Sequence, residues 1–386
     1  MAAGVVAWCA GLAVAGKVAY ASLAGPSGGE RVDDLKVYLT STRGLNDGAG
    51  LYAYHSGIQD GFTYPPFAGI LLFPLNRMPF LTAAITWTSL TLVSIAILAV
   101  TAGRALSKTA HGFTLLSGAI FAALAVSAPV ASDLRFGQIS LILAAPTALA
   151  ILNAGRSRVP GLIIGTLSGI KLTPLIYIPY LVTSGSRRNA VTAALTFLAT
   201  IILALIFLPR DSLHFWTSTI FDGTKVHAFT SSGNISLAAT LQRLAITGNL
   251  GTAIWCITAA TVFASSLWRA TCADRNGNHL AALVIMGAAS LAISPISWTH
   301  HQIWLVLAAF TPVRGARNFK ILWTTTVLVV MIAPLAEARP ALTLLTASLV
   351  PFRGTVGWSA RDSLAWRTEG SFFRIGRFVP RLKYLR

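Results

Sequence analysis

Hydrophobic residues occur along this chain in long runs, and short polar segments separate the runs. A helix that spans a membrane needs about 20 apolar residues, so each run is a candidate span. Several runs are shorter than this and would have to extend into their flanks or tilt. The pattern predicts an all-α polytopic transmembrane bundle with about ten spans, at residues 5–24, 81–103, 113–130, 139–152, 191–208, 250–268, 280–293, 303–312, 321–334 and 341–350.

One more apolar segment, residues 161–182, differs from these runs because Lys171 and Pro174 lie in its middle. Proline breaks a helix, and a lysine is costly at the centre of a bilayer. We therefore expect two half-helices here that form a re-entrant hairpin and do not cross the membrane.

The basic residues support this topology. With a cytoplasmic N-terminus and a hairpin at 161–182, the short outward loops hold only Arg135 and Arg339. The short inward loops hold eleven basic residues, namely Arg104, Lys108, Arg156, Arg158, Arg187, Arg188, Arg269, Arg275, Arg314, Arg317 and Lys320. This is the positive-inside bias of membrane proteins. The same arrangement puts nine of the twelve carboxylates outside, so we expect the polar chemistry on the outer face.

Composition agrees with a membrane protein. Charged residues make up only 11% of the chain, whereas a soluble domain carries about 25%. A net charge of +18 would suggest a nucleic-acid partner in a soluble protein, but cationic loops next to anionic lipid explain it here, and no nucleic-acid-binding motif is visible. The three cysteines lack metal-ligand spacing, so we expect neither a zinc site nor a disulfide framework.

Two polar segments are long enough to have structure of their own. The first polar segment, residues 25–80, is expected to be an outer loop with an interfacial helix, and it holds four of the eight tyrosines. The second polar segment, residues 209–249, is a further outer loop with an amphipathic helix expected near 236–246. Residues 1–352 would form one transmembrane domain, and the basic residues 353–386 would form a cytoplasmic tail on anionic lipid.

The first polar segment holds the best candidates for acid–base chemistry. Asp33 and Asp34 follow the first span closely, and either carboxylate could accept a proton from a hydroxyl group. Two adjacent acids are more often simply solvated, so the pair alone does not establish a site. The spacing of Asp34 and Tyr38 would place both side chains on one face of a short helix.

Several short motifs occur in order along the chain. They are Asp34-Leu35-x-Val37-Tyr38, Gly48-x-x-Leu51-Tyr52, Phe62-Thr63-Tyr64-Pro65-Pro66, Arg135-Phe136-Gly137-Gln138-Ile139-Ser140, Gly169-Ile170-Lys171-Leu172-Thr173-Pro174 and Ser294-Pro295-Ile296-Ser297-Trp298-Thr299-His300-His301. In this order they resemble glycosyltransferase family 87, a group of integral membrane enzymes in the GT-C superfamily. The resemblance covers residues 1 to about 335 as separate islands.

The resemblance implies a sugar transferase with a polyprenyl-phosphate donor and a catalytic carboxylate in the first outer loop. The motif places that carboxylate at Asp34, with Asp33 as the second candidate. The family's members add mannose to phosphatidylinositol mannosides, lipomannan or lipoarabinomannan, and some related enzymes use an arabinofuranosyl donor instead. Such a reaction needs no nucleotide site, and the chain has no P-loop and no dinucleotide fingerprint.

Candidates for binding the donor's phosphate and sugar lie in the same motifs. Lys171 needs an anionic partner inside its apolar hairpin, although snorkelling to the interface would also explain it. Arg135 and Gln138 flank an outer turn and could bind phosphate or sugar hydroxyls.

The remaining candidates are aromatic or histidine side chains. His300 and His301 could contact the donor or simply cap a helix, and a metal site is disfavoured because adjacent histidines point to different helix faces. Tyr38 and Tyr64 could stack on a sugar or pack at the interface.

We therefore expect an inverting α-mannosyltransferase without a metal or other cofactor, whose active site lies on the outer face of the plasma membrane. Its partners would be a polyprenyl-phosphate-mannose donor, a lipid-linked mannoside acceptor and membrane lipids. The nearest alternative is an arabinofuranosyltransferase with the same type of donor. A lipid-linked-sugar transporter is a competitor from another class, since broken helices with an intramembrane lysine also occur in transporters. That class predicts inverted repeats, which the sequence does not show.

Overall fold

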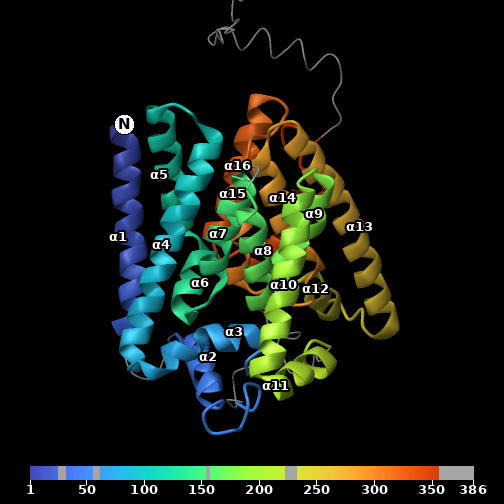
Figure 1. The fold of residues 1–386 in the computed structure, drawn as a ribbon. Coiled ribbons are helices and arrows are strands. Elements are labelled where there is room, and N and C mark those ends of the chain that lie inside the picture. The colour runs from blue at the N-terminus through green and yellow to red at the C-terminus, as the bar shows by residue number, and fades with distance from the viewer. Residues whose placement is uncertain (25–31, 55–60, 154–156, 222–232, 356–386) are drawn as a thin grey trace, which may run out of the picture.

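A computed structural model describes residues 1–24, 32–54, 61–153, 157–221 and 233–355, and most of these residues are helical (Figure 1). The α-helices are α1 (Ala2–Ala24), α2 (Asp33–Arg43), α3 (Pro66–Leu72), α4 (Phe80–Leu106), α5 (Ala110–Val126), α6 (Ala128–Phe136), α7 (Ser140–Leu152), α8 (Val159–Ile170), α9 (Tyr177–Thr183), α10 (Arg187–Phe207), α11 (Pro209–His214), α12 (Leu237–Arg243), α13 (Gly248–Arg275), α14 (His279–Ile293), α15 (Ile303–Ala308), α16 (Arg317–Ile332) and α17 (Arg339–Leu344).

Tighter or wider helical turns link several of these helices. They are η1 (Phe73–Arg77), η2 (Thr173–Ile176), η3 (Phe215–Thr219), η5 (Thr299–His301), η6 (Ala336–Ala338) and η7 (Leu345–Leu349). Within the described residues, β pairing is limited to two isolated antiparallel bridges, Asn234 with Trp298 and Val313 with Phe352. The second bridge lies directly before the predicted basic tail, most of which falls outside the described residues.

Four of the described helices, α1, α4, α10 and α13, are long and apolar enough to span a membrane. The bent pair α5–α6 would make a fifth span. Large apolar side chains cover the exposed faces of α1, α10 and α13, as expected for contact with lipid. The protein is an all-α membrane protein.

The sequence predicted about ten spans, and fewer helices reach the necessary length. The predicted span at 113–130 shows the reason, because the chain bends by 60° between α5 and α6. Pro129 lies in the first turn of α6, and a proline cannot donate the backbone hydrogen bond that would continue α5. Other apolar runs become helices of 10–17 residues, such as α7, α8 and α14.

The segment around Lys171 consists of two helices with a break between them. Helix α8 ends at Ile170, Lys171 is extended, and Pro174 lies in the first turn of η2. Three glycines at a spacing of four residues let α8 approach α10 closely, since a Cβ at any of them would lie within 2.6 Å of an α10 atom.

These contacts also give the direction of α8. Gly161 lies against Asn189 near the start of α10, and Gly169 lies against Thr200 farther along the same helix. Helices α8 and α10 therefore run in the same direction. The chain must return through η2 and α9 before α10 begins, so Lys171 lies at the tip of a helical hairpin.

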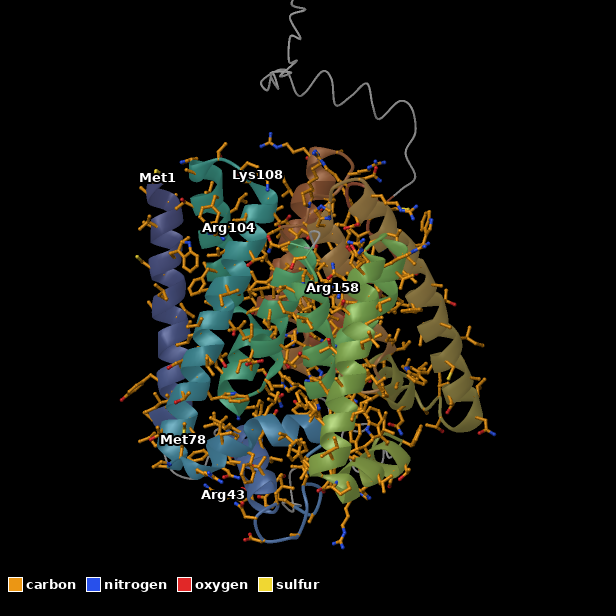
Figure 2. All side chains as sticks on the ribbon, in the orientation of Figure 1. Met1, Arg43, Met78, Arg104, Lys108 and Arg158 are labelled. Atoms are coloured by element: carbon orange, nitrogen blue, oxygen red, sulfur yellow. The ribbon has the colours of Figure 1, made fainter. Side chains whose placement is uncertain are left out.

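The described part of the first polar segment, residues 32–54 and 61–80, packs across one end of the bundle. Helices α2 and α3 lie at the lower end in Figure 1, beside α11, whereas the N-terminus lies at the upper end. Figure 2 likewise shows Arg43 and Met78 at the lower end, and Met1, Arg104 and Lys108 at the upper end. We call these the α2 end and the N-terminal end of the bundle.

Candidate active site

A small aromatic core holds the first polar segment in place at the α2 end. The ring centroid of Tyr38 lies 5.4 Å from that of Tyr64 and 6.0 Å from that of Trp87 in α4. Phe62 packs edge-on against both tyrosines. Each aromatic pair of this kind contributes about 0.5–1.5 kcal/mol beyond its buried area, so the core fixes where the tyrosine hydroxyls lie.

The start of α2 is fastened to the turn between α6 and α7. The backbone N–H of Val32 donates to the carbonyl of Arg135 at 2.8 Å. Gly137 ends α6 with a positive φ of 67°, and a Cβ at this position would lie 2.6 Å from Cγ1 of Val32. A glycine is therefore required here for two reasons, its backbone conformation and the close approach of α2.

The two adjacent aspartates point to different surroundings. Asp33 forms an ion pair with Lys36, one turn further along α2, at 2.8 Å. Asp34 is partly buried and accepts a short hydrogen bond from the side-chain amide of Gln138. Asp34 and Tyr38 both reach Gln138, so the prediction that they share one helix face is confirmed.

Gln138 connects Asp34 to the two buried tyrosines. Its amide oxygen accepts from the hydroxyl groups of Tyr38 and Tyr64, each at 3.2 Å, and these hydroxyls lie 3.0 Å apart. The backbone carbonyl of Gln138 accepts from the indole of Trp87 at 3.3 Å. Burial raises the pKa of both tyrosines above the ordinary value, so both remain protonated donors at neutral pH.

Lys171 brings a cation into this cluster from the tip of the hairpin. Its ammonium is 3.4 Å from the hydroxyl of Tyr64, 3.5 Å from Oγ of Ser140 and 2.9 Å from Nε2 of His301. The lysine side chain is buried, and none of the ion pairs among the described residues includes it. A buried ammonium without a carboxylate in contact is costly, which favours an anionic ligand at this point.

The contact between Lys171 and His301 has an unusual proton arrangement. Nδ1 of His301 accepts the backbone N–H of Trp298 at 3.2 Å. A neutral imidazole whose Nδ1 accepts carries its proton on Nε2, which is the atom that faces Lys171. The ammonium of Lys171 and the Nε2–H of His301 are therefore two donors that face each other, with no acceptor between them. An oxygen of a bound anion could accept from both of them.

His300 points away from His301, toward α6. The two rings are perpendicular with centroids 4.5 Å apart, and Nδ1 of His300 lies 3.5 Å from Oγ of Ser132. Nε2 of His300 is buried and has no hydrogen-bond partner among the described residues. The expectation that the two histidines face different directions is therefore correct, and only His301 reaches Lys171.

Arg135 lies at the edge of the cluster. Its guanidinium is exposed and sits 5.3 Å from the ring centroid of Phe136.

Two polar residues near the cluster, Ser140 and Asp133, were not predicted as site residues from the sequence. Ser140 contacts Lys171 from the first turn of α7, and its hydroxyl in the Gln138-Ile139-Ser140 motif was the available signal. Asp133 is fully buried, and its Oδ2 accepts from the N–H of Leu141 at 3.1 Å.

A pocket of about 50 Å³ adjoins Lys171 and His301. Hydroxyl groups of Ser140 and Thr173 line it near the lysine. Its other walls are mostly apolar and come from α7, η2, α9, α14 and α15, including Leu143, Ala144, Pro174, Tyr177, Leu291, Ile303 and Trp304. The pocket therefore offers a cation at one end and an apolar surface beyond it.

Comparison with known proteins identifies the family of this chain. The model of glycosyltransferase family 87 matches residues 62–295, which is more than half of the chain. The chain belongs to glycosyltransferase family 87. This family match includes Tyr64, Gln138 and Lys171, begins after Asp34 and ends before the histidine pair.

Individual relatives extend the similarity. The enzyme is 32% identical to a Mycobacterium tuberculosis protein named polyprenol-phosphate-mannose-dependent alpha-(1-2)-phosphatidylinositol pentamannoside mannosyltransferase, over 76% of this chain and 69% of the relative. It is 29% identical to a second protein of that organism, named polyprenol-phosphate-mannose-dependent alpha-(1-2)-phosphatidylinositol mannoside mannosyltransferase, over 71% of this chain and 68% of the relative. A Mycolicibacterium smegmatis protein with the same name as the second is also 29% identical. The family is one of sugar transferases, not of transporters.

Proposed function

We propose that this enzyme transfers mannose from a polyprenyl-phosphate-mannose donor to a hydroxyl group of a phosphatidylinositol mannoside or a related lipid-linked mannoside. The names of its relatives support this donor and this acceptor. The structural observation that carries the proposal is the contact of Lys171 with His301, where two donors face each other with no acceptor between them. A phosphate oxygen of the donor supplies that acceptor.

The reaction is an inverting single displacement. Asp34 removes the proton from the acceptor hydroxyl, whose oxygen then attacks the anomeric carbon of the donor sugar. The bond from that carbon to the phosphate oxygen breaks, and polyprenyl phosphate leaves with the bonding electron pair. Lys171 and His301 stabilise the negative charge that develops on the departing phosphate. Tyr38, Tyr64 and Gln138 hold Asp34 and Lys171 in place.

The pocket supports one orientation of the donor. Asp34 is joined to Lys171 through Gln138 and Tyr64, whereas the pocket begins at Lys171 and His301 and does not include Asp34. With the phosphate at Lys171, the sugar lies toward Asp34 and the first part of the prenyl chain lies in the apolar pocket. His300 and Arg135 remain candidates for contacts with the sugar or the phosphate.

The proposed setting is the plasma membrane, with the α2 end on the outer face. Helix α8 has 12 residues, so it is about 18 Å long, and the hydrocarbon core of a bilayer is about 30 Å thick. The hairpin of α8, η2 and α9 is therefore re-entrant and brings Lys171 to the α2 end without crossing. The charge bias of the loops supports this orientation.

A transfer assay tests the proposal. Purified protein in nanodiscs receives radiolabelled polyprenyl-phosphate-mannose or the arabinose equivalent, a phosphatidylinositol mannoside acceptor, and EDTA. We expect mannose transfer that persists with the chelator. Transfer only from the arabinose donor would replace the proposed sugar, and no transfer from either donor across several mannoside acceptors would overturn the proposed reaction.

A further inference from the structure

The second polar segment is attached to the loop that carries the two histidines. Asn234 and Trp298 form an antiparallel bridge, and the N–H of Ile235 donates to the carbonyl of Ser297 at 2.9 Å. The hydroxyl of Ser236 donates to the carbonyl of Pro295 at 2.7 Å. Three consecutive residues of the second polar segment therefore hold the chain that leads directly into η5.

The side chain of Asn234 is the centre of this attachment. Its Oδ1 accepts the N–H of Ser236 and the N–H of Ser297, each at 3.0 Å. The bond to Ser236 is a local turn contact that asparagine often makes. The bond to Ser297 is different because it joins positions 63 residues apart. Asn234 is fully buried, so water cannot replace this acceptor.

The attachment leads to the proposed phosphate site in two steps. Ser297 precedes Trp298, and the N–H of Trp298 donates to Nδ1 of His301. That bond determines which ring nitrogen of His301 carries the proton, and it directs Nε2 toward Lys171. A shift of the backbone at Ser297 would therefore change both the position and the tautomer of His301.

We propose that Asn234 is a positioning residue for the donor-phosphate site, and that it acts through Trp298 and His301. This inference rests on the proposed function, because it assumes that His301 binds the phosphate of the donor. Through Asn234, the second polar segment then holds the imidazole of His301 against Lys171 at the tip of the hairpin. Asn234 itself does not contact Lys171 in the described contacts and is not assigned to the substrate.

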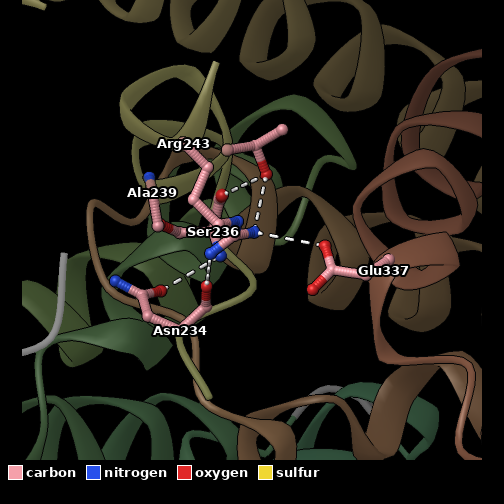
Figure 3. A network of polar contacts seen from close by, with 6 residues as sticks. Asn234, Ser236, Ala239, Arg243 and Glu337 are labelled. Carbon is pink, nitrogen blue, oxygen red and sulfur yellow. Dashed lines mark hydrogen bonds and ion pairs between the residues drawn. The ribbon is translucent and has the colours of Figure 1, made fainter. Parts of the chain in front are cut away.

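A nearby ion pair offers a matched control. Nη1 of Arg243 donates to the backbone carbonyl of Asn234 at 2.8 Å, and its Nη2 lies 3.6 Å from a carboxylate oxygen of Glu337 (Figure 3). The Glu337 side chain is 72% exposed, so this ion pair contributes little. Loss of the Glu337 charge leaves the acceptor role of Asn234 intact.

The experiment measures kcat and KM for the donor and for the acceptor in nanodiscs. Asn234→Ala removes the acceptor of two buried N–H groups, and a small displacement at a reaction centre can cost about 100-fold. We expect donor kcat/KM to fall at least tenfold with the acceptor KM unchanged. Glu337→Gln leaves the acceptor oxygen of Asn234 in place and should stay within threefold of wild type.

A double-mutant cycle separates positioning from a general structural role. In a His301→Ala background, Asn234→Ala should lower the residual transfer by less than threefold, because its effect passes through His301. An equal loss in both backgrounds, or normal transfer by Asn234→Ala alone, would overturn the inference. If Asn234→Ala does not fold, Ser236→Ala replaces it in this cycle, because it removes the hydrogen bond to Pro295 in the same attachment. No transfer by the wild-type enzyme would instead overturn the proposed function.

Discussion

Two hydrogen-bonded networks, each with an aspartate, lie at opposite ends of the bundle. The Asp34 network, at the α2 end, consists of Asp34, Gln138, Tyr38, Tyr64, Lys171 and His301. The Asp274 network lies at the C-terminal end of α13, where Asp274 accepts from the hydroxyl of Tyr180 at 2.8 Å and contacts Nδ1 of His279 at 2.7 Å. Both networks join helices that are distant in the sequence.

The two networks differ in how completely their polar groups are paired. Among the described residues, the buried polar atoms without partners include Oδ1 of Asp133, Nε2 of His300 and both amide atoms of Gln302, near the Asp34 network, and none in the Asp274 network. Native proteins leave few such groups. A fully paired network is sufficient to hold helices together, whereas unpaired buried groups are expected where a polar ligand binds.

The largest expected effect distinguishes the two adjacent aspartates of α2. Asp34→Asn should lower kcat by about 10²–10⁴-fold, because it removes the general base. Asp33→Asn should stay within about threefold, because Asp33 pairs with the half-exposed Lys36, whereas Asp34 accepts from Gln138 in the cluster. Both variants are purified as monodisperse samples. Their transfer rates show which of the two aspartates is the general base. Equal losses would assign no special role to Asp34.

Lys171 should show the next largest effect. Lys171→Met keeps the length and the apolar part of the side chain but removes the charge, and we expect a loss of about 10²–10³-fold in kcat. Lys36→Met serves as the matched control, since its ammonium is half exposed and pairs with Asp33. A Lys171→Met protein with wild-type kcat would show that the lysine serves packing alone.

A smaller effect compares tyrosines of the two networks. Tyr64→Phe removes the hydroxyl that contacts Lys171 and Gln138 while the ring remains in the aromatic core. The loss of hydrogen bonds to a charged neighbour should cost roughly tenfold in transfer. Tyr180→Phe removes the corresponding hydroxyl of the Asp274 network and should leave transfer within twofold. Similar losses from both variants would remove the distinction between the networks.

The smallest effect on activity is expected at Asp274. Asp274→Ala should lower the free energy of unfolding by about 1–3 kcal/mol, because Tyr180 and His279 lose their shared acceptor. Transfer at a temperature well below unfolding should stay within threefold of wild type. Thermal unfolding in nanodiscs and the transfer assay measure the two quantities on one preparation. A large loss of transfer in a stable variant would give this network a functional role.

Local features of the sequence predicted much of the Asp34 network. The spacing of Asp34 and Tyr38 placed both on one face of α2, and Lys171 with Pro174 predicted the break between α8 and α9. These predictions depend on helix periodicity and on the geometry of proline, which act over a few residues. The sequence could not decide between Asp33 and Asp34, because the contact that places Asp34 in the cluster comes from the distant Gln138.

Long-range packing accounts for what the sequence could not give. His301 and Lys171 are 130 residues apart, and no local pattern brings them together. The role of Asn234 could not be predicted from a polar segment, because it depends on a hydrogen bond with Ser297, which is distant in the sequence. The predicted number of about ten spans is not confirmed for a related reason, because hydropathy does not show bends such as the one between α5 and α6.

The most direct test of the account compares the same truncation in both networks. Asp34→Ala and Asp274→Ala are prepared side by side in nanodiscs, and mannose transfer from polyprenyl-phosphate-mannose is measured below the unfolding temperature of each. We expect transfer by Asp34→Ala to be at least 100-fold slower than transfer by Asp274→Ala, although Asp274→Ala is the less stable protein. Equal transfer rates, or a slower Asp274→Ala, would contradict the assignment of the reaction to the α2 end.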